Sequence, residues 1–204
     1  MNKTVTLILR GVLLVASLAL IYALVQSILE PIRFNKVKQE RYTQVINKLK
    51  DIRIAQRAYK SEYGRYTGSF DTLVDFLKNG QLTVELQIGS LDDSVAVAKG
   101  LVKRIKQKIN VRDSLLKNVN YDSLAYVPAA KPGTKFEMAS GILLTSSKVE
   151  VPVFEAKVHN DLILYDLERQ QVVNLNDERK KLDKYPGLKV GDLNMATNDS
   201  GNWE

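Results

Sequence analysis

The N-terminal part of the chain carries a long apolar run without charge. Residues 11–29 contain no charged side chain, and Ser17, Gln26 and Ser27 are their only clearly polar members. A helix rises about 1.5 Å per residue, so this run nearly crosses a hydrocarbon core of about 30 Å. A cleaved signal peptide would have a shorter apolar run that ends in small residues. The pattern therefore predicts an uncleaved, single membrane span, with residues 1–30 as the anchor.

The charges on either side of this span leave its orientation open. More Lys and Arg residues follow the span than precede it. By the positive-inside rule, this excess favours a cytoplasmic C-terminal domain. The excess is modest, however, and a long folded domain can translocate despite it.

Beyond the span, apolar residues recur every three or four positions, which is the spacing of one helix face. Pro31 predicts a kink or a short break before this helix, and Gly64 is expected to end it. A parallel coiled coil and a helix packed on its own sheet would both use such a stripe. The polar Gln56 and the basic outer face favour the helix on a sheet. The stripe comprises Tyr42, Val45, Leu49, Ile52, Gln56, Tyr59 and Tyr63.

The rest of the chain mixes helical and strand patterns. Residues 72–78 and 91–118 place apolar side chains on one helical face, and residues 176–190 indicate a charged helix or loop. From about residue 119 the pattern becomes mainly β, and Pro152 predicts an edge or bulged strand. The strands are expected over residues 81–88, 124–127, 135–145, 149–158, 162–165 and 172–175. The predicted fold class is α+β, with residues 31–204 as a soluble domain, residues 31–63 as its long helix and residues 119–175 as mainly β.

The formal net charge of +7 is concentrated in two stretches. Residues 33–62 hold nine Lys and Arg against three acids, residues 99–117 hold seven against one, and the rest is acidic overall. A nucleic-acid binder would be basic more uniformly. Tyr42 and Tyr59 fall on the apolar stripe, where they cannot stack on bases. We therefore expect no nucleic-acid partner.

The two basic stretches have three interpretations. The default is a solvated helix face. The first stretch begins just after the span, so it could contact anionic lipid headgroups. The second could bind an acidic protein partner or a neighbouring subunit. The membrane-proximal basic face comprises Arg33, Lys36, Lys38 and Arg41, and the partner-binding basic face comprises Lys103, Arg104, Lys106 and Lys108.

Few residues in the chain are suited to catalysis. It has no cysteine, which excludes disulfides and thiolate sites, and its one histidine, His159, lies in an expected solvated turn. Phosphate-binding, dinucleotide-binding, hydrolase and zinc-protease motifs are absent from the sequence. We therefore expect a protein that is not an enzyme, with no metal, no cofactor and no small-molecule substrate. The hypothesis that the chain is an enzyme is supported by no sequence motif.

One segment carries a family resemblance. Residues 54–66 are IAQRAYKSEYGRY, and Phe70, Leu73 and Leu77 follow. With the apolar helix and the proline before it, this order resembles type IV pilins and type II secretion pseudopilins over residues 5–80. The family-like positions are Ala58, Tyr59, Tyr63, Gly64 and Tyr66.

The resemblance implies a pilin-like fold and a structural or assembly role in a bacterial envelope or secretion apparatus. It also implies the bacterial inner membrane, with the globular domain in the periplasm. The leader motif departs from the family, because Thr4 stands where its glycine would be and Leu9 where its glutamate would be. We therefore expect no prepilin-peptidase cleavage and no glutamate-to-amine docking of subunits.

Two functions follow as hypotheses. The first is a non-enzymatic, membrane-anchored, pilin-like component of an envelope or secretion apparatus, with protein partners or self-association. The alternative is a membrane-tethered cytoplasmic module that binds anionic lipid or an acidic protein partner through its basic helices.

Overall fold

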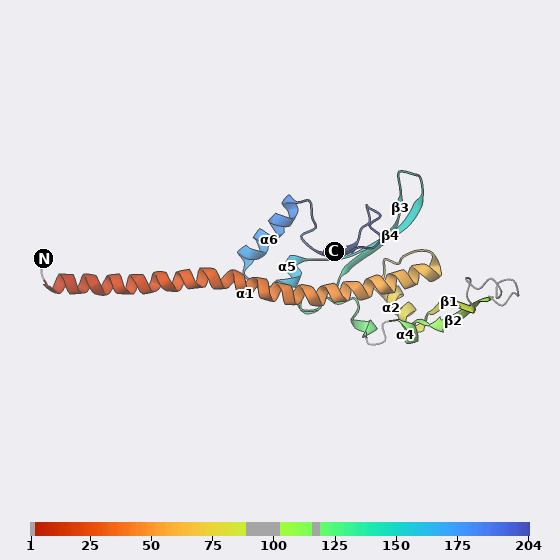
Figure 1. The fold of residues 1–204 in the computed structure, drawn as a ribbon, viewed down its shortest axis with the longest axis horizontal. Helices are drawn as coiled ribbons and strands as arrows, with labels where there is room; N and C mark the ends of the chain where they lie inside the picture. The colour runs from red at the N-terminus through yellow and green to blue at the C-terminus, as the bar shows by residue number, and fades with distance from the viewer. Residues whose placement is uncertain (1–2, 89–102, 116–118) are drawn as a thin grey trace.

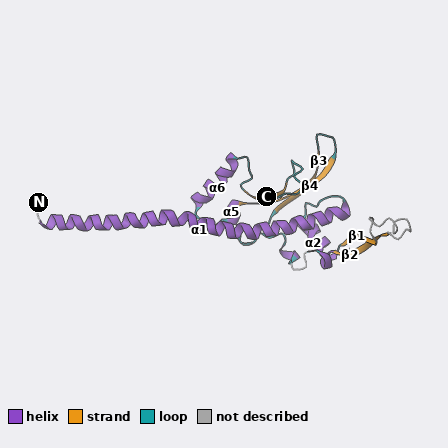
Figure 2. Ribbon diagram, in the orientation of Figure 1, coloured by secondary structure: helices purple, strands orange, loops and turns teal. Residues whose placement is uncertain are grey.

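The computed structural model describes residues 3–88, 103–115 and 119–204. Helix α1 (Lys3–Tyr63) runs most of the length of the molecule, and its N-terminal half stands alone while the other elements gather around and beyond its C-terminal half (Figure 1). In the described residues, two antiparallel sheets, one of two strands and one of three, complete an α+β fold (Figure 2). The predicted fold class, a long N-terminal apolar helix followed by antiparallel sheet, is confirmed at this level.

Helix α1 is unbroken over 61 residues and contains Pro31. The predicted break at Pro31 is therefore wrong. A proline removes only one hydrogen bond from the helix, the one to the carbonyl of Ser27, four residues earlier. The bonds on both sides of that site are enough to continue the helix through it.

The apolar stripe of α1 is the centre of the core. Val45, Leu49, Ile52 and Ala55 are completely buried. They pack in one cluster with residues of α2, the three-stranded sheet and the C-terminal helices, including Leu73, Leu77, Phe154, Ile163, Leu188 and Val190. The prediction of a helix packed on its own domain is confirmed, although Tyr63 at the end of the stripe is exposed.

Gln56 explains how a polar residue can sit within this stripe. Its Nε2 donates to the carbonyl of Thr67 at 2.6 Å, and the backbone N–H of Thr67 donates to its Oε1 at 3.2 Å. Both ends of the buried amide are satisfied, so its burial does not carry the cost of an unpaired polar group. Gln56 thereby fixes the loop that follows the helix.

The end of α1 follows the sequence prediction. Gly64 adopts a positive φ of 71°, which glycine tolerates best, and its N–H donates to the carbonyl of Lys60 at 2.8 Å. Helix α2 (Phe70–Asn79) begins slightly earlier than expected and buries Leu73, Phe76 and Leu77.

Strand β1 (Gln81–Ile88) confirms the predicted strand, and it pairs antiparallel with β2 (Lys103–Asn110). The helix predicted over residues 91–118 is wrong for residues 103–110, while residues 89–102 and 116–118 lie outside the described residues. Ile105 and Ile109 are four positions apart, a spacing that fits both a helix face and a strand face. Pairing with β1 decides between them. A short helix, α4 (Val111–Ser114), follows.

The three-stranded sheet has the order β3-β4-β5. Strands β3 (Glu137–Leu144) and β4 (Glu150–His159) confirm two predicted strands, whereas β5 (Gly187–Gly191) was not predicted. β4 lies between β3 and β5 over residues 155–159 but has β3 alone beside it over residues 150–154, so the expected edge is confirmed at Pro152 and wrong for the rest of the strand. Pro152 is tolerated there because β5 pairs only with residues 155–159, so β4 has β3 alone beside Pro152.

Three further predicted strands are not strands. Residues 124–127 follow the 3₁₀ helix η1 (Tyr121–Ser123) and form only an isolated bridge between Tyr126 and Lys135. Residues 162–165 and 172–175 belong largely to α5 (Asn160–Ile163) and α6 (Arg169–Lys181). Such short apolar runs fit either period, so residues 119–175 are less β-rich than predicted.

The burial of the apolar stripe of α1 leads to a prediction with a matched control substitution. We expect Ile52→Ala to lower the free energy of unfolding by about 2–5 kcal/mol, because Ile52 is completely buried. Ile54→Ala, two residues away on the same helix and 41% exposed, should cost less than about 1 kcal/mol. Denaturation of the detergent-solubilised chain, followed by the fluorescence of its one tryptophan, Trp203, measures both. Equal losses would contradict the assigned orientation of α1.

Candidate membrane anchor and its junction with the folded domain

The N-terminal half of α1 is apolar around its whole circumference. Val12, Leu13, Leu14 and Val15 are 59–66% exposed, and four successive helical residues cover every side of a helix. Among the described residues, α1 is the one helix long and apolar enough to cross a membrane. A surface of this kind is unfavourable in water, so it needs lipid or another protein around it.

Two of the three clearly polar side chains in this segment, Ser17 and Gln26, find partners within the helix. The Ser17 hydroxyl donates to the carbonyl of Leu14 at 2.8 Å, and Gln26 Nε2 donates to the Tyr22 hydroxyl at 3.0 Å. These bonds lower the cost of moving the groups into a nonpolar medium. The segment is therefore compatible with a hydrocarbon environment along its whole length.

The four residues of the membrane-proximal basic face do not act as one surface. Arg33 and Lys36 are exposed, and neither makes an ion pair within the described part of the chain. Lys38 donates to Asn35 Oδ1 at 2.7 Å and is partly buried, which lowers its pKa. Arg41 is turned toward the domain. Only Arg33 and Lys36 are thus free to meet headgroups.

Arg41 joins α1 to the corner between α5 and α6. Its guanidinium donates to both carboxylate oxygens of Asp166, at 2.6 and 2.9 Å, and to the carbonyl of Ile163 at 2.8 Å. The bonds from Arg41 lower the pKa of Asp166, while burial raises it by less. This bidentate geometry is the strongest arrangement available to such a pair.

A buried polar network lies beside this ion pair. The Tyr42 hydroxyl donates to Asn160 Oδ1 at 2.6 Å, Asn160 Nδ2 donates to Asn176 Oδ1 at 2.9 Å, and Asn176 Nδ2 donates to Asp161 Oδ1 at 2.8 Å. Burial raises the pKa of Tyr42. The network connects α1, α5 and α6, and a half-satisfied version of it would be costly. The α5–α6 corner is therefore fixed on α1 close to the apolar segment.

The C-terminal tail neutralises other members of the first basic stretch. Arg53 pairs with Glu204 at 2.6 Å, and Arg57 pairs with Asp199 at 3.0 Å. The hydrogen bond from Arg53 lowers the pKa of Glu204. The sequence analysis missed these pairs, because the partners are more than 140 positions apart. The one available signal was the acidic balance of the rest of the chain.

The family-like residues gather where α1 ends. Ala58 and Tyr59 are buried, and the Tyr59 ring lies 4.5 Å from Tyr63 and 5.3 Å from Phe76 of α2. The Tyr66 hydroxyl donates to Asp199 Oδ2 at 2.7 Å. Burial raises the pKa of Tyr66, and this hydrogen bond raises it further. The cluster joins α1 to α2 and to the tail, which is a structural task.

The partner-binding basic face lies on a strand, not on a helix. Lys103, Arg104, Lys106 and Lys108 all belong to β2. Lys106 lies across from Glu85 of β1, and their charged atoms are 3.5 Å apart. The predicted basic helix is therefore wrong here, and part of its charge is balanced by the neighbouring strand.

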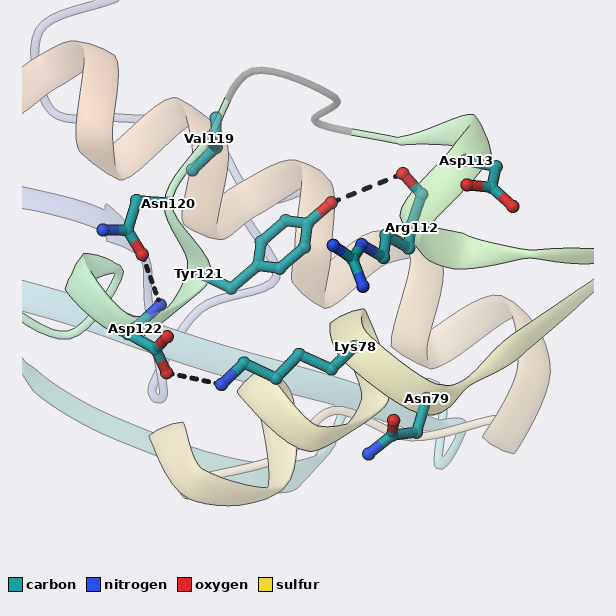
Figure 3. A pocket seen from close by; sticks show the side chains of 8 residues that line it. All are labelled: Lys78, Asn79, Arg112, Asp113, Val119, Asn120, Tyr121 and Asp122. Atoms are coloured by element: carbon teal, nitrogen blue, oxygen red, sulfur yellow. Dashed lines mark hydrogen bonds and ion pairs between the residues drawn. The ribbon is translucent and has the colours of Figure 1, made fainter.

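A cavity of about 790 Å³ lies between α2, α4 and η1. Figure 3 shows Lys78 reaching toward Asp122, and their charged atoms are 2.5 Å apart. The Tyr121 hydroxyl contacts the carbonyl of Arg112 at 3.5 Å. The lining residues are Lys78, Asn79, Arg112, Asp113, Val119, Asn120, Tyr121 and Asp122. The sequence analysis did not single out this cleft.

This cleft is lined mainly by polar and charged side chains. Its lining has no histidine, cysteine or serine, and its ionisable side chains are Lys78, Arg112, Asp113, Tyr121 and Asp122. No group of three or more His, Asp or Glu that could hold a metal ion is found among the described residues. His159 lies elsewhere, where its Nδ1 accepts from the backbone N–H of Asp161 at the start of α5.

Comparisons with protein-family models, curated protein sequences and solved structures found no match for this chain.

The Arg41–Asp166 pair predicts a pH dependence of stability. The pKa of Asp166 is lowered below its ordinary value of 3.8, so the pair stabilises the fold above that pH and ceases to do so as pH falls through the folded value. At pH 7, Asp166→Asn should lower the free energy of unfolding by up to about 1 kcal/mol. Below the folded pKa, the variant and the parent should converge in urea titrations.

Asp177→Asn is the matched control, because Asp177 is an exposed aspartate of α6 that makes no ion pair with the described residues. The Asp177→Asn substitution should leave the free energy of unfolding unchanged at every pH. A difference between Asp166→Asn and the parent that persists at low pH would contradict the electrostatic role of Asp166.

Proposed function

We propose that the chain is a single-pass, membrane-anchored protein with a pilin-like architecture. It acts as a structural or assembly component of a bacterial envelope or secretion apparatus, without enzymatic activity. The observation that carries this proposal is α1 itself. One unbroken helix has an N-terminal half that is apolar on all sides and a C-terminal half that forms the core of an α+β domain.

The continuity of α1 supports a scaffold over a tethered module. Residues 30–63 add about 50 Å of helix beyond the uncharged run, at about 1.5 Å per residue. Contacts from the domain begin close to the apolar segment, because Phe34 is already buried. A flexible linker would let the domain move independently. This helix instead transmits position and orientation from the membrane to the domain.

The proposed location is the inner membrane, with the domain in the periplasm. The substitutions of the leader motif, Thr4 and Leu9, lead us to expect that copies dock without the family's glutamate contact.

The alternative, a cytoplasmic module that binds through basic helices, has less support. Arg41, Arg53 and Arg57 are used within the fold, and the second basic stretch includes a strand in which Lys106 already faces an acid. The remaining free basic residues near the span are few. Its prediction is salt-sensitive binding to anionic vesicles through Arg33 and Lys36.

Cysteine labelling tests the proposed topology. The chain has no cysteine, so a single Leu182→Cys at a 60% exposed position is the only thiol. A membrane-impermeant maleimide should label it in intact spheroplasts. Asn2→Cys, at the other end of the span, should be labelled only after lysis. The reverse pattern would overturn the periplasmic placement and favour the cytoplasmic alternative.

Charge in the apolar segment tests the anchor. Each arginine at the centre of a spanning helix costs about 2.5–3.5 kcal/mol. We expect the double variant Leu14→Arg and Leu18→Arg to move the chain from the alkali-resistant membrane fraction into the soluble or aggregated fraction. Leu182→Arg, an equally exposed leucine of the domain, should stay with the membrane. Retention of the double variant in the membrane would refute the anchor.

A further inference from the structure

Strand β3 has an edge that is open over its last residues. The Thr145 N–H donates to the carbonyl of Val149 at 3.0 Å, so the backbone groups of Thr145 face β4. With the register of β3 and β4, this bond shows which residues of β3 are hydrogen-bonded to β4. In an antiparallel ladder, successive residues direct their backbone groups to opposite sides. Ile142 and Leu144 therefore direct their N–H and C=O groups away from β4. The position of Pro152 opposite Ile142 agrees, because a proline fits only where no ladder donor is needed.

The start of β3 and the outer side of β5 are covered. The start of β3 is bonded through the Phe136 N–H, which donates to Ala125, and the backbone of Gly68 lies against Ser140. On the far side, the Gly191 N–H donates to Ser200, and the Asn202 N–H donates to Lys189, so the tail covers β5. Within the described residues, no backbone partner lies beside residues 142–144 of β3, and β4 likewise has no strand beside residues 150–153 on its β5 side, where Pro152 removes a donor.

This open edge lacks the usual protection. Exposed edges are normally blocked by a charged residue, a proline or a bulge. Residues 138–147 carry no charge and no proline, and the nearest charges are Lys148 in the turn and Glu150 opposite Leu144. Ile142, Leu144 and Val149 at the hairpin tip are 67%, 63% and 55% exposed. The tip stands clear of the rest of the domain (Figure 1). An unprotected apolar edge on a folded protein points to a partner.

A groove of about 400 Å³ runs beside the open edge. One wall is β3, and the other is the loop that follows α1, which Gln56 fixes through Thr67. Tyr59 and Thr72 also line the groove. Arg65 lines it as well and makes no ion pair among the residues described, so it supplies one free positive charge.

We propose that residues 141–144 of β3 accept an extended segment of a partner protein as an added strand. The backbone of that segment pairs with Ile142 and Leu144, aliphatic side chains at alternate positions cover the apolar tip, and a carboxylate meets Arg65. Strand addition gives affinity through main-chain bonds and specificity through the side chains beside the edge. With so few residues open, the contact is weak and reversible.

A second copy of the chain does not fit this edge as well as a different protein does. Continuation of the sheet from β3 of one copy to β5 of the next is blocked, because residues 200–202 cover β5. If two copies of the chain paired through their β3 edges, the two-fold axis relating the copies would be perpendicular to the sheet. The sheet packs on α1, so such an axis would reverse α1 and point the two anchors in opposite directions. Only this last step rests on the proposed membrane anchor.

Two defined peptides test the proposal on the full-length chain in detergent. Each alternates threonine and valine over eight residues, and one carries an aspartate at its N-terminus while the other carries it at its C-terminus. Fluorescence anisotropy gives the affinity, and hydrogen exchange with mass spectrometry reports the segment over residues 141–145. We expect one peptide to bind, to slow exchange in that segment and to leave β5 unchanged. Absence of both effects for both peptides at millimolar concentration overturns the proposal.

Variants separate backbone pairing from fold. Ile142→Pro removes an outward N–H and no ladder bond, as Pro152 does in β4, so the fold should persist while binding weakens about tenfold. Ile142→Thr keeps the N–H and should bind within a few-fold of the parent. Arg65→Gln should weaken binding and remove its dependence on the peptide's aspartate. Unchanged binding by a folded Ile142→Pro, or by Arg65→Gln, refutes the proposed mode.

Cross-linking distinguishes a partner from self-pairing. Ile142→Cys gives the chain a single thiol at the edge. In membranes with mild oxidant, we expect the chain to remain a monomer on non-reducing gels, with the thiol accessible to maleimide and protected by the bound peptide. A disulfide-linked dimer of the chain would overturn the assignment to a different protein, without affecting the test of the anchor.

Discussion

Val45, Leu49, Ile52 and Ala55 form a face of α1 with no exposed surface, and the other elements are assembled against it. The burial of this face holds together segments that lie more than 100 residues apart. Gln56 extends the dependence to the loop after the helix, and Arg41 and Tyr42 extend it to α5 and α6. The domain has no second core of comparable size among the described residues. Loss of packing along this face would therefore release the sheet, the corner and the tail together.

The ion pairs also hold C-terminal segments against α1. The first basic stretch of α1 faces a C-terminal region that supplies Asp166, Asp199 and Glu204. The net charge of +7 therefore overstates what is available to an external ligand. Such pairs contribute little individually at a surface, but they specify which face of the helix the tail covers. The charged residues of this chain position its own elements on one another more than they bind an external ligand.

The sequence allowed the long helix, its end at Gly64 and the strands β1, β3 and β4 to be predicted, because each shows one clear period over several residues. Prediction failed where the pattern was short or fitted two periods, as at Ile105 and Ile109 in β2 and at residues 162–175. β5 was missed because Gly187 and Pro186 suggest a turn, and only pairing with β4 makes the segment a strand. The open edge of β3 could not be predicted either, since it depends on which strands find partners.

Because α1 continues through Pro31, the apolar segment and the domain also have a fixed rotation relative to each other about the helix axis. An α-helix turns about 100° per residue, so every side of the apolar segment has a fixed angular relation to every side of the domain. Removal of one residue between them would rotate the domain by about that angle, and insertion of seven would nearly restore it. A neighbour that contacts one side of the apolar segment thereby determines which side of the domain it meets beyond that segment.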